Sequence, residues 1–275
     1  MFDYHVHTLF CGHAYGSMEE YVLRAVELGL EEIGFSGHYP YPPSFEETLP
    51  NCVIPAQSHP VYLAEAARLR EAYRDRIVVR IGAEFDYLGD GQSFHPLDEA
   101  RRLGLDFCLA SVHLVDGVAV DYTPELLEKN LQRFTGGIDG VYDRYYRTLL
   151  EMVAPGYCTT VGHLDLVKKF NTLAGLAPGL DHSSMVEQVL ERIASSGIAV
   201  EINTSGWDKP CGEQYPAIGI LKKALELGIA LTAGSDAHRP EEVGRHFDRL
   251  KVLLNQLGVR QLMRFEKLQA VPCDI

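Results

Sequence analysis

Histidines and carboxylates recur in this sequence at the points where short apolar runs end. His5 and His7 are two residues apart in such a run, so in an extended chain their side chains leave the same face and can hold one ion. Asp236 and His238 repeat that spacing. One histidine alone is as often a polar core or surface group as a ligand, but nine groups at equivalent positions predict a metal centre. The nine are His5, His7, His13, His38, Glu84, His113, His163, Asp236 and His238.

The ligand types indicate which ions and which chemistry to expect. Imidazole with carboxylate suits zinc, iron or manganese, and the lack of an obvious cysteine ligand argues against a closed structural zinc site. Nine ligands exceed the needs of one ion, so two or three ions are implied. A carboxylate such as Glu84 can bridge two ions, and paired ions about 3.5 to 4 Å apart are a known device for phosphoryl displacement.

The apolar runs alternate with stretches of helical periodicity, which is typical of parallel strands joined by crossover helices. The first helix is predicted to begin at the capping pair Ser17 and Glu20 and to stop at Gly29. Further helices are expected over about 61–76, 125–134, 141–153, 184–196, 217–227 and 241–254. The strands are expected over 2–5, 32–36, 77–83, 106–111, 159–162, 198–202 and 229–233.

Seven such units predict one α/β domain over residues 1–275, a barrel related to the (β/α)8 type with its active site at the carboxyl ends of the strands. Six of the seven strands lead directly into a candidate ligand. Two consecutive helices after the fourth strand would be an insertion. The proline-rich segment 39–60 is predicted to be a long loop, often a functional lid, over one end of the sheet. The stretch after Leu254 is expected to close the barrel floor or cover its side.

Composition narrows the possible partners. The formal charge of −13 disfavours a broad grip on a nucleic-acid backbone, although bound cations would still admit an anionic small substrate. The first ten residues lack the features of a secretory signal, and no run of about 18 apolar residues indicates a membrane span, so a cytoplasmic location is expected. The oligomeric state is left open.

The sequence also resembles a known superfamily. DYHVHT, SGH, GAE, SVH, GHLD and GSDAH look like the successive motifs of the polymerase-and-histidinol-phosphatase (PHP) superfamily, from residue 3 to about 245. SVHLVDG, GHLDLVKKF and EINTSGWDKP look like its histidinol-phosphatase branch. The resemblance implies a distorted (β/α)7 barrel that hydrolyses L-histidinol phosphate to L-histidinol and phosphate, a step of histidine biosynthesis.

The same resemblance implies a trinuclear centre of divalent ions, with zinc expected and iron or manganese as alternatives. By position, His5, His7, Glu84 and Asp236 would surround one ion. The second ion would be held by Glu84, His113 and His163, and the third by His13, His38 and His238. Glu84, Asp236 and His238 are the candidates for a direct catalytic role. In the expected mechanism a metal-activated hydroxide attacks phosphorus in line with the leaving alcohol, and no protein nucleophile is required.

Substrate contacts are less well marked. The cations near strand ends that could bind phosphate are Lys168, Lys169, Lys209 and Arg239. Asn203 could contact substrate, but we favour a role in capping the next turn. The possible acceptors for a substrate ammonium group are Asp86, Asp116 and Asp165. Arg245 and His246 are interpreted as helix surface.

Two other functions fit parts of the pattern, besides a PHP-type phosphoesterase acting on another small phosphate ester. A C–N amidohydrolase also uses a histidine pair on its first strand, but it often has a bridging lysine on strand four, where this chain has His113. A catalytically idle metal-binding module is the third possibility. The intact ligand set and the absence of any attached domain count against it.

Overall fold

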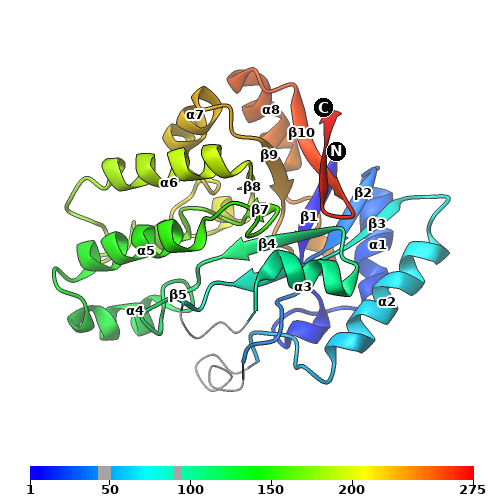
Figure 1. Ribbon diagram of the computed structural model, residues 1–275, viewed down its shortest axis with the longest axis horizontal. Helices are drawn as coiled ribbons and strands as arrows, with labels where there is room; N and C mark the ends of the chain where they lie inside the picture. The colour runs from blue at the N-terminus through cyan, green and yellow to red at the C-terminus, as the bar shows by residue number, and fades with distance from the viewer. Residues whose placement is uncertain (43–50, 90–93) are drawn as a thin grey trace.

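Seven parallel strands form the centre of the molecule. The computed structural model describes residues 1–42, 51–89 and 94–275, and its strands pair in the order β1-β2-β3-β4-β7-β8-β9 (Figure 1). The seven predicted strands are therefore confirmed. They are β1 (Phe2–Val6), β2 (Glu32–Phe35), β3 (Val78–Asp86), β4 (Phe107–Ser111), β7 (Thr160–Val161), β8 (Ala199–Asn203) and β9 (Leu231–Gly234).

The sheet closes into a distorted (β/α)7 barrel, as expected. In the described part of the chain, the segment after β9 joins the end of β1 through an isolated parallel bridge between Val6 and Ala237. His7 N donates to Ala237 O at 2.9 Å, and Ala237 N donates to His5 O at 3.2 Å. The closure thus lies at the carboxyl ends of the strands and brings the two ligand pairs of the sequence side by side.

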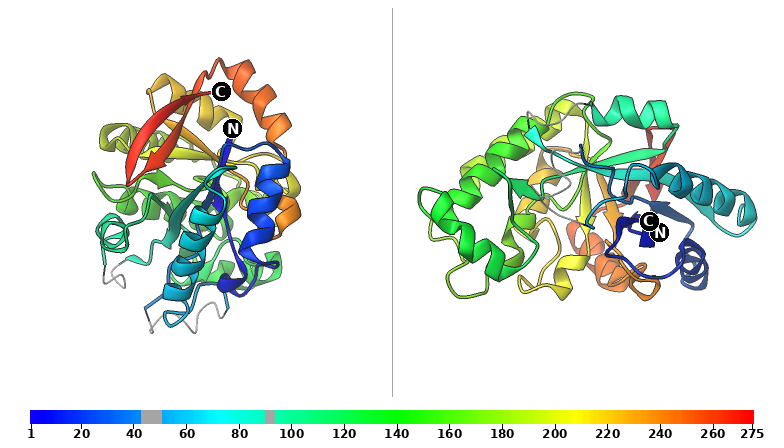
Figure 2. Two further views of the ribbon diagram at one scale, coloured as in Figure 1. Left: turned by 90° about the vertical axis from the view of Figure 1, so that its right-hand side faces the viewer. Right: turned by 90° about the horizontal axis from the view of Figure 1, so that it is seen from below.

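Helices surround the strands (Figures 1 and 2). The first one is capped as predicted: Ser17 and Glu20 form a capping box, and Gly29, with φ of 67°, ends it. The last helix begins six residues later than expected, because His246 has φ of 59° and Phe247 is the first helical residue. The helices are α1 (Met18–Glu27), α2 (His59–Ala72), α3 (Pro96–Leu103), α4 (Pro124–Asn130), α5 (Ile138–Met152), α6 (Ser183–Ser196), α7 (Ile218–Glu226) and α8 (Phe247–Leu257).

Two segments add to the simple alternation. After β4, the expected pair of helices, α4 and α5, is preceded by a short hairpin of β5 (Leu114–Val115) and β6 (Val118–Ala119). Residues 43–50 of the predicted proline-rich loop lie outside the described residues. Its second part returns to the barrel, where Ile54 N donates to His38 O. No helix among the described residues is long and apolar enough to cross a membrane.

The C-terminal hairpin closes the floor of the barrel, as expected, although its two strands were not predicted. It consists of β10 (Gln261–Glu266) and β11 (Gln269–Asp274) and lies beside the N-terminus in every view (Figures 1 and 2). Arg264 donates to Glu32 Oε1 at 3.0 Å, and Leu268 N donates to Asp106 O at 2.7 Å. Because Glu32 and Asp106 lie at the amino ends of their strands, the hairpin covers the end opposite the predicted ligands.

Aromatic side chains fill the interior between floor and ligands. The ring of Tyr4 stacks between those of Phe2 and Phe107, with centroids 4.8 and 5.1 Å away. Gly34 and Gly82 make room for this layer, because a Cβ at either position would overlap the Phe107 ring. The layer separates the two charged ends of the barrel.

Candidate metal centre

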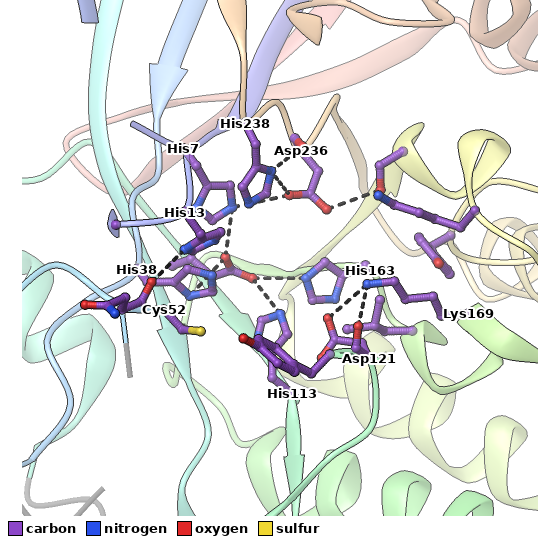
Figure 3. A pocket seen from close by; sticks show the side chains of 18 of the residues that line it. His7, His13, His38, Cys52, His113, Asp121, His163, Lys169, Asp236 and His238 are labelled. Carbon is purple, nitrogen blue, oxygen red and sulfur yellow. Dashed lines mark hydrogen bonds and ion pairs between the residues drawn. The ribbon is translucent and has the colours of Figure 1, made fainter. Parts of the chain in front are cut away.

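The carboxyl ends of the strands bring together all nine predicted ligands. His5 and Glu84 lie within β1 and β3, and the other seven follow the end of a strand. Eight of the nine line one cavity of about 460 Å³ (Figure 3), and fully buried His5 contacts them from outside its wall. Residues up to 233 positions apart in the sequence therefore form one cluster.

Glu84 lies at the centre of this cluster, and its two carboxylate oxygens face different histidines. Oε2 lies 3.2 Å from His5 Nε2 and 3.4 Å from His7 Nε2. Oε1 lies 3.0 Å from His163 Nε2 and 3.7 Å from His113 Nε2. Each oxygen of Glu84, together with the imidazoles that it faces, would be able to hold a divalent ion.

Asp236 completes the group on the Oε2 side. Its Oδ1 lies 3.3 Å from His7 Nε2 and 3.7 Å from His5 Nε2. Asp236 adopts φ of 54°, a strained conformation for a residue other than glycine. Arg245 holds this turn, because Nε donates to Ser235 O at 2.8 Å and the guanidinium also donates to Asp236 O. The interpretation of Arg245 as helix surface is therefore wrong, and His246 precedes the helix rather than lying in it.

Several imidazoles are anchored through Nδ1, which directs Nε2 at the cluster and leaves Nε2 as the nitrogen that can give up its proton to a metal ion. His13 Nδ1 lies 3.0 Å from Cys11 O, and His238 Nδ1 lies 3.0 Å from Asp236 O. His113 Nδ1 bonds Asp86 Oδ1, and His5 Nδ1 lies 2.7 Å from Glu201 Oε1. Carbonyl and carboxylate oxygens only accept, so the proton must be on Nδ1. This second layer of contacts is typical of histidines that bind metals.

The donor set fits divalent ions. His5 Nε2 and His7 Nε2 are 3.1 Å apart, and carboxylate oxygens of Glu84 and Asp236 lie beside them. Lone pairs that converge in this way repel one another unless a cation lies between them. The described residues contain five overlapping sets of three donors within 4.8 Å of one another, all in this cluster.

The set proposed from the sequence for a third ion is only partly assembled. His13 and His238 form a compact group with His7, and the rings of His13 and His238 lie 4.8 Å apart. His38 is instead grouped with His7 and Glu84 and with Asp86 and His113. His38 Nδ1 lies 3.3 Å from Asp86 Oδ2, so Asp86 is a further candidate ligand that the sequence did not indicate.

The histidines and carboxylates shift one another's pKa values. Burial opposes the charged form of His113, but Asp86 and Glu84 raise its pKa to about 10. Burial lowers the pKa of His238 to about 4, and Asp236 only partly offsets this. Despite burial, His38 and His5 lower the pKa of Glu84 well below its ordinary value. The carboxylates therefore stay ionised and keep their oxygens available to a cation.

The predicted phosphate-binding cations differ in their surroundings. Lys169 and Lys209 line the cavity. Lys169 Nζ donates to Asp121 O at 2.6 Å, whereas Lys209 Nζ has no hydrogen bond or ion pair with the described residues. Lys168 lies outside the cavity wall and is held by Asp165 at 2.9 Å and by Glu213 at 3.0 Å.

Arg239 and Asn203 also lie outside the cavity wall. Arg239 is exposed and stacks on Tyr15, with 4.3 Å between Cζ and the ring centroid. Asn203 Oδ1 accepts from Ser205 N at 3.0 Å, which is the turn-capping contact favoured from the sequence. Its Nδ2 lies 3.4 Å from Asp236 Oδ2.

The three acidic residues that the sequence suggested as acceptors for a substrate ammonium group already have protein partners. Asp116 accepts from Arg144 at 2.9 Å, Asp165 pairs with Lys168, and Asp86 faces two histidines. The sequence missed Asp121, which lines the cavity from the turn after β6. Nothing in its local pattern marks it, because only the fold brings it beside His113 and His163.

The fold and the cluster define a class: a seven-stranded barrel whose strand ends present imidazole and carboxylate donors to divalent ions. The sequence model described as PHP domain matches residues 3–205, and one described as PHP-associated matches residues 221–249. The chain therefore belongs to the PHP family.

Individual relatives indicate the branch. The "Probable histidinol-phosphatase" of Deinococcus radiodurans is 34% identical over 274 residues, covering 97% of this chain and 98% of the relative. The histidinol-phosphatase of Bacillus subtilis is 30% identical, covering 90% and 96%. The crystal structure of hisK from Listeria monocytogenes is 26% identical and superposes with a TM-score of 0.81, covering 90% and 99%. The resemblance to the histidinol-phosphatase branch is thus confirmed.

Proposed function

We propose that the protein is a metal-dependent phosphomonoesterase that hydrolyses L-histidinol phosphate to L-histidinol and phosphate. The observation that carries the proposal is the arrangement around Glu84, whose two carboxylate oxygens face two separate sets of imidazole nitrogens beside one cavity. The names of the full-length relatives supply the substrate. We also propose that residues 1–275 act as one PHP-type domain in the cytoplasm.

Three divalent ions, of which zinc is the first candidate, would occupy the cluster. The set of His5, His7, Glu84 and Asp236 would hold one, and Glu84 with His113 and His163 a second. His13 and His238, with His7 or His38, would hold the third. When bound, such ions lower the pKa of water and neutralise charge on phosphoryl oxygens.

The residues around the cluster supply binding and orientation. Lys209 Nζ has no hydrogen bond or ion pair within residues 1–42, 51–89 and 94–275, and burial lowers its pKa, so an anionic phosphate would relieve the cost of burying its charge. Lys169 lines the same cavity, with its charge close enough to lower the pKa of Lys209 further, and would contact the same phosphate or keep Asp121 in place. A cavity of about 460 Å³ has the size expected for a small ester.

Asp121 is the acceptor we propose for the ammonium group of the substrate. Although burial opposes ionisation, Lys169, His113 and His163 lower the pKa of Asp121, so its carboxylate is charged at neutral pH. It lines the same cavity as the metal cluster, and its ion pair with Lys169 Nζ, at 3.5 Å, is longer than the 2.9 Å pairs that hold Asp116 and Asp165. Asp121→Asn should therefore weaken binding of L-histidinol phosphate more than binding of a phosphomonoester without an amine.

The test is phosphate release by the purified, metal-loaded protein. L-Histidinol phosphate would be compared with a panel of phosphomonoesters and a phosphodiester, with bound metal measured on the same sample. We expect the highest kcat/KM for L-histidinol phosphate. Preference for another monoester would keep the chemistry and change the substrate, whereas no release from any ester with metals bound would refute the proposal.

A further inference from the structure

Glu201 is a buried carboxylate that the sequence pattern left without a role. It lies on β8, the one strand that leads into none of the nine predicted ligands, and its side chain is 1% exposed. We infer that Glu201 is the positioning residue of the metal centre: it fixes which nitrogen of His5 faces the ions and joins three of the strands that carry ligands. This inference rests on the metal-dependent function proposed above.

Both oxygens of Glu201 accept hydrogen bonds from the elements that carry ligands. Oε1 lies 2.7 Å from His5 Nδ1, on β1. Oε2 accepts from the backbone N of His163, just after β7, at 2.8 Å and from Asn203 Nδ2 at 3.2 Å. Because Asn203 Nδ2 also lies 3.4 Å from Asp236 Oδ2, the network extends to the residue after β9.

The contact with His5 has a chemical consequence. A neutral imidazole carries one N–H, and a carboxylate at Nδ1 draws that proton to itself. Nε2 then keeps its lone pair, and it is this atom that lies 3.2 Å from Glu84 Oε2 and 3.1 Å from His7 Nε2. Without an acceptor at Nδ1, the proton can occupy Nε2 and block the ion.

The neighbouring strands leave space for this carboxylate. A Cβ at Gly234, the last residue of β9, would overlap Glu201 Oε1 and His5 Cβ. A Cβ at Gly162 would overlap Ser111 Oγ and lie 3.7 Å from Glu201 Oε2. The two glycines therefore leave room for the side chain of Glu201, which contacts the metal-ligand cluster but does not line its cavity.

Glu201→Gln tests the inference, because glutamine keeps the shape but cannot accept two N–H groups with both ends. Its oxygen must accept from the backbone of His163, so its NH₂ would face His5 Nδ1 and drive the proton to Nε2. We expect weaker binding of one zinc equivalent by about ten- to a hundredfold, the usual cost of losing such a partner. The measurement is bound zinc against buffered free zinc.

Glu32→Gln is the matched control, since Glu32 is also a fully buried carboxylate on a barrel strand, but at the floor. It should lower thermal stability and leave zinc affinity unchanged. Equal zinc affinity of Glu201→Gln and wild type, or an equal loss in both variants, would show that Glu201 is merely structural. A wild-type protein that binds no zinc would instead refute the proposed function, and the inference with it.

A measurement on the wild type covers the case in which Glu201→Gln does not fold. In the zinc-loaded protein, ¹⁵N NMR of the His5 ring should show a protonated Nδ1 and a metal-bound Nε2. A protonated Nε2, or zinc on Nδ1, would overturn the inference.

Discussion

At the floor of the barrel, Glu32 accepts hydrogen bonds from Arg80 at 2.9 Å, from Arg264 at 3.0 Å and from the Tyr4 hydroxyl. At the opposite end, Glu84 faces five imidazoles, and the described residues place no arginine or lysine on it. Both carboxylates are fully buried in neighbouring strands. The same residue type is therefore neutralised in two ways within one barrel.

The different partners of Glu32 and Glu84 indicate that the floor of the barrel contributes to stability and the opposite end to metal binding and function. An arginine is permanently charged and holds a carboxylate in a fixed pair, so the floor is complete with protein groups alone. An imidazole near neutral pH is either protonated and positively charged, or neutral with a nitrogen lone pair that can bind a metal ion. The histidines at the carboxyl ends of the strands can therefore exchange protons for metal ions. We expect substitutions at the floor to lower stability, and substitutions at the upper end to remove metal and activity.

Glu84→Gln should produce the largest effect. The amide retains one donor oxygen but loses the charge and the second oxygen that bridging requires. We expect kcat/KM for L-histidinol phosphate to fall by about a thousandfold or more, which corresponds to roughly 4 kcal/mol of transition-state stabilisation. Bound metal should fall in the same sample, with an unchanged far-UV circular dichroism spectrum. Full metal content with wild-type turnover would contradict the bridging role.

Glu32→Gln should have the opposite profile. Loss of the charged partner of Arg80 and Arg264 should lower the free energy of unfolding by about 2 kcal/mol, the scale of hydrogen bonds to charged groups. Denaturant titration measures the loss, and kcat should remain within about twofold of wild type because the aromatic layer separates the floor from the cluster. A change in metal content would show that the two ends are coupled.

Sequence patterns predict the upper end of this barrel better than its floor. Ligands at the strand ends can be predicted from the local sequence, because each follows or lies within an apolar run. That run predicts a strand whose carboxyl end lies at the active-site end of the barrel. The floor hairpin gave no such signal. Its two-residue turn, Lys267 and Leu268, has φ of 48° and 65°, values that Asn-Gly usually adopts, and a proline such as Pro272 is uncommon within strands.

Long-range contacts explain the remaining differences. Glu201 is separated from His5 by 196 residues and lies in an apolar run, so only the closed barrel shows that they pair. Lys168 and Lys169 are adjacent in the sequence, yet one is bound to Asp165 and Glu213 and the other lines the cavity. Spacing alone cannot make that distinction.

Lys209→Ala should have a smaller effect, because it removes a cation without disturbing any ligand. We expect KM for L-histidinol phosphate to rise about tenfold, with a smaller change in kcat, since one charge-assisted contact is worth roughly 1.5 kcal/mol. Lys251→Ala, an exposed lysine of α8, is the control. Equal KM values for the two variants would place the phosphate elsewhere in the cavity.

The pH dependence of stability should show the sharpest contrast between the two ends of the barrel. In metal-free protein the pKa of His113 is raised to about 10, from an ordinary value near 6.5, so its charged pair with Asp86 stabilises the fold fully below pH 6.5. That contribution declines above pH 6.5 and is lost as the pH rises through about 10.

His238, whose pKa is lowered to about 4, changes stability only below pH 6.5, so it does not affect the range from pH 6.5 to 10 in which His113 acts. Chelated protein should therefore lose more stability between pH 7 and 9 than zinc-loaded protein, whose His113 is already neutral. Arginine pairs at the floor do not titrate in this range, and His5 and His38, whose pKa values are also raised, act in the same direction as His113. Equal curves with and without zinc would show that none of these three histidines gives up a proton to the ion.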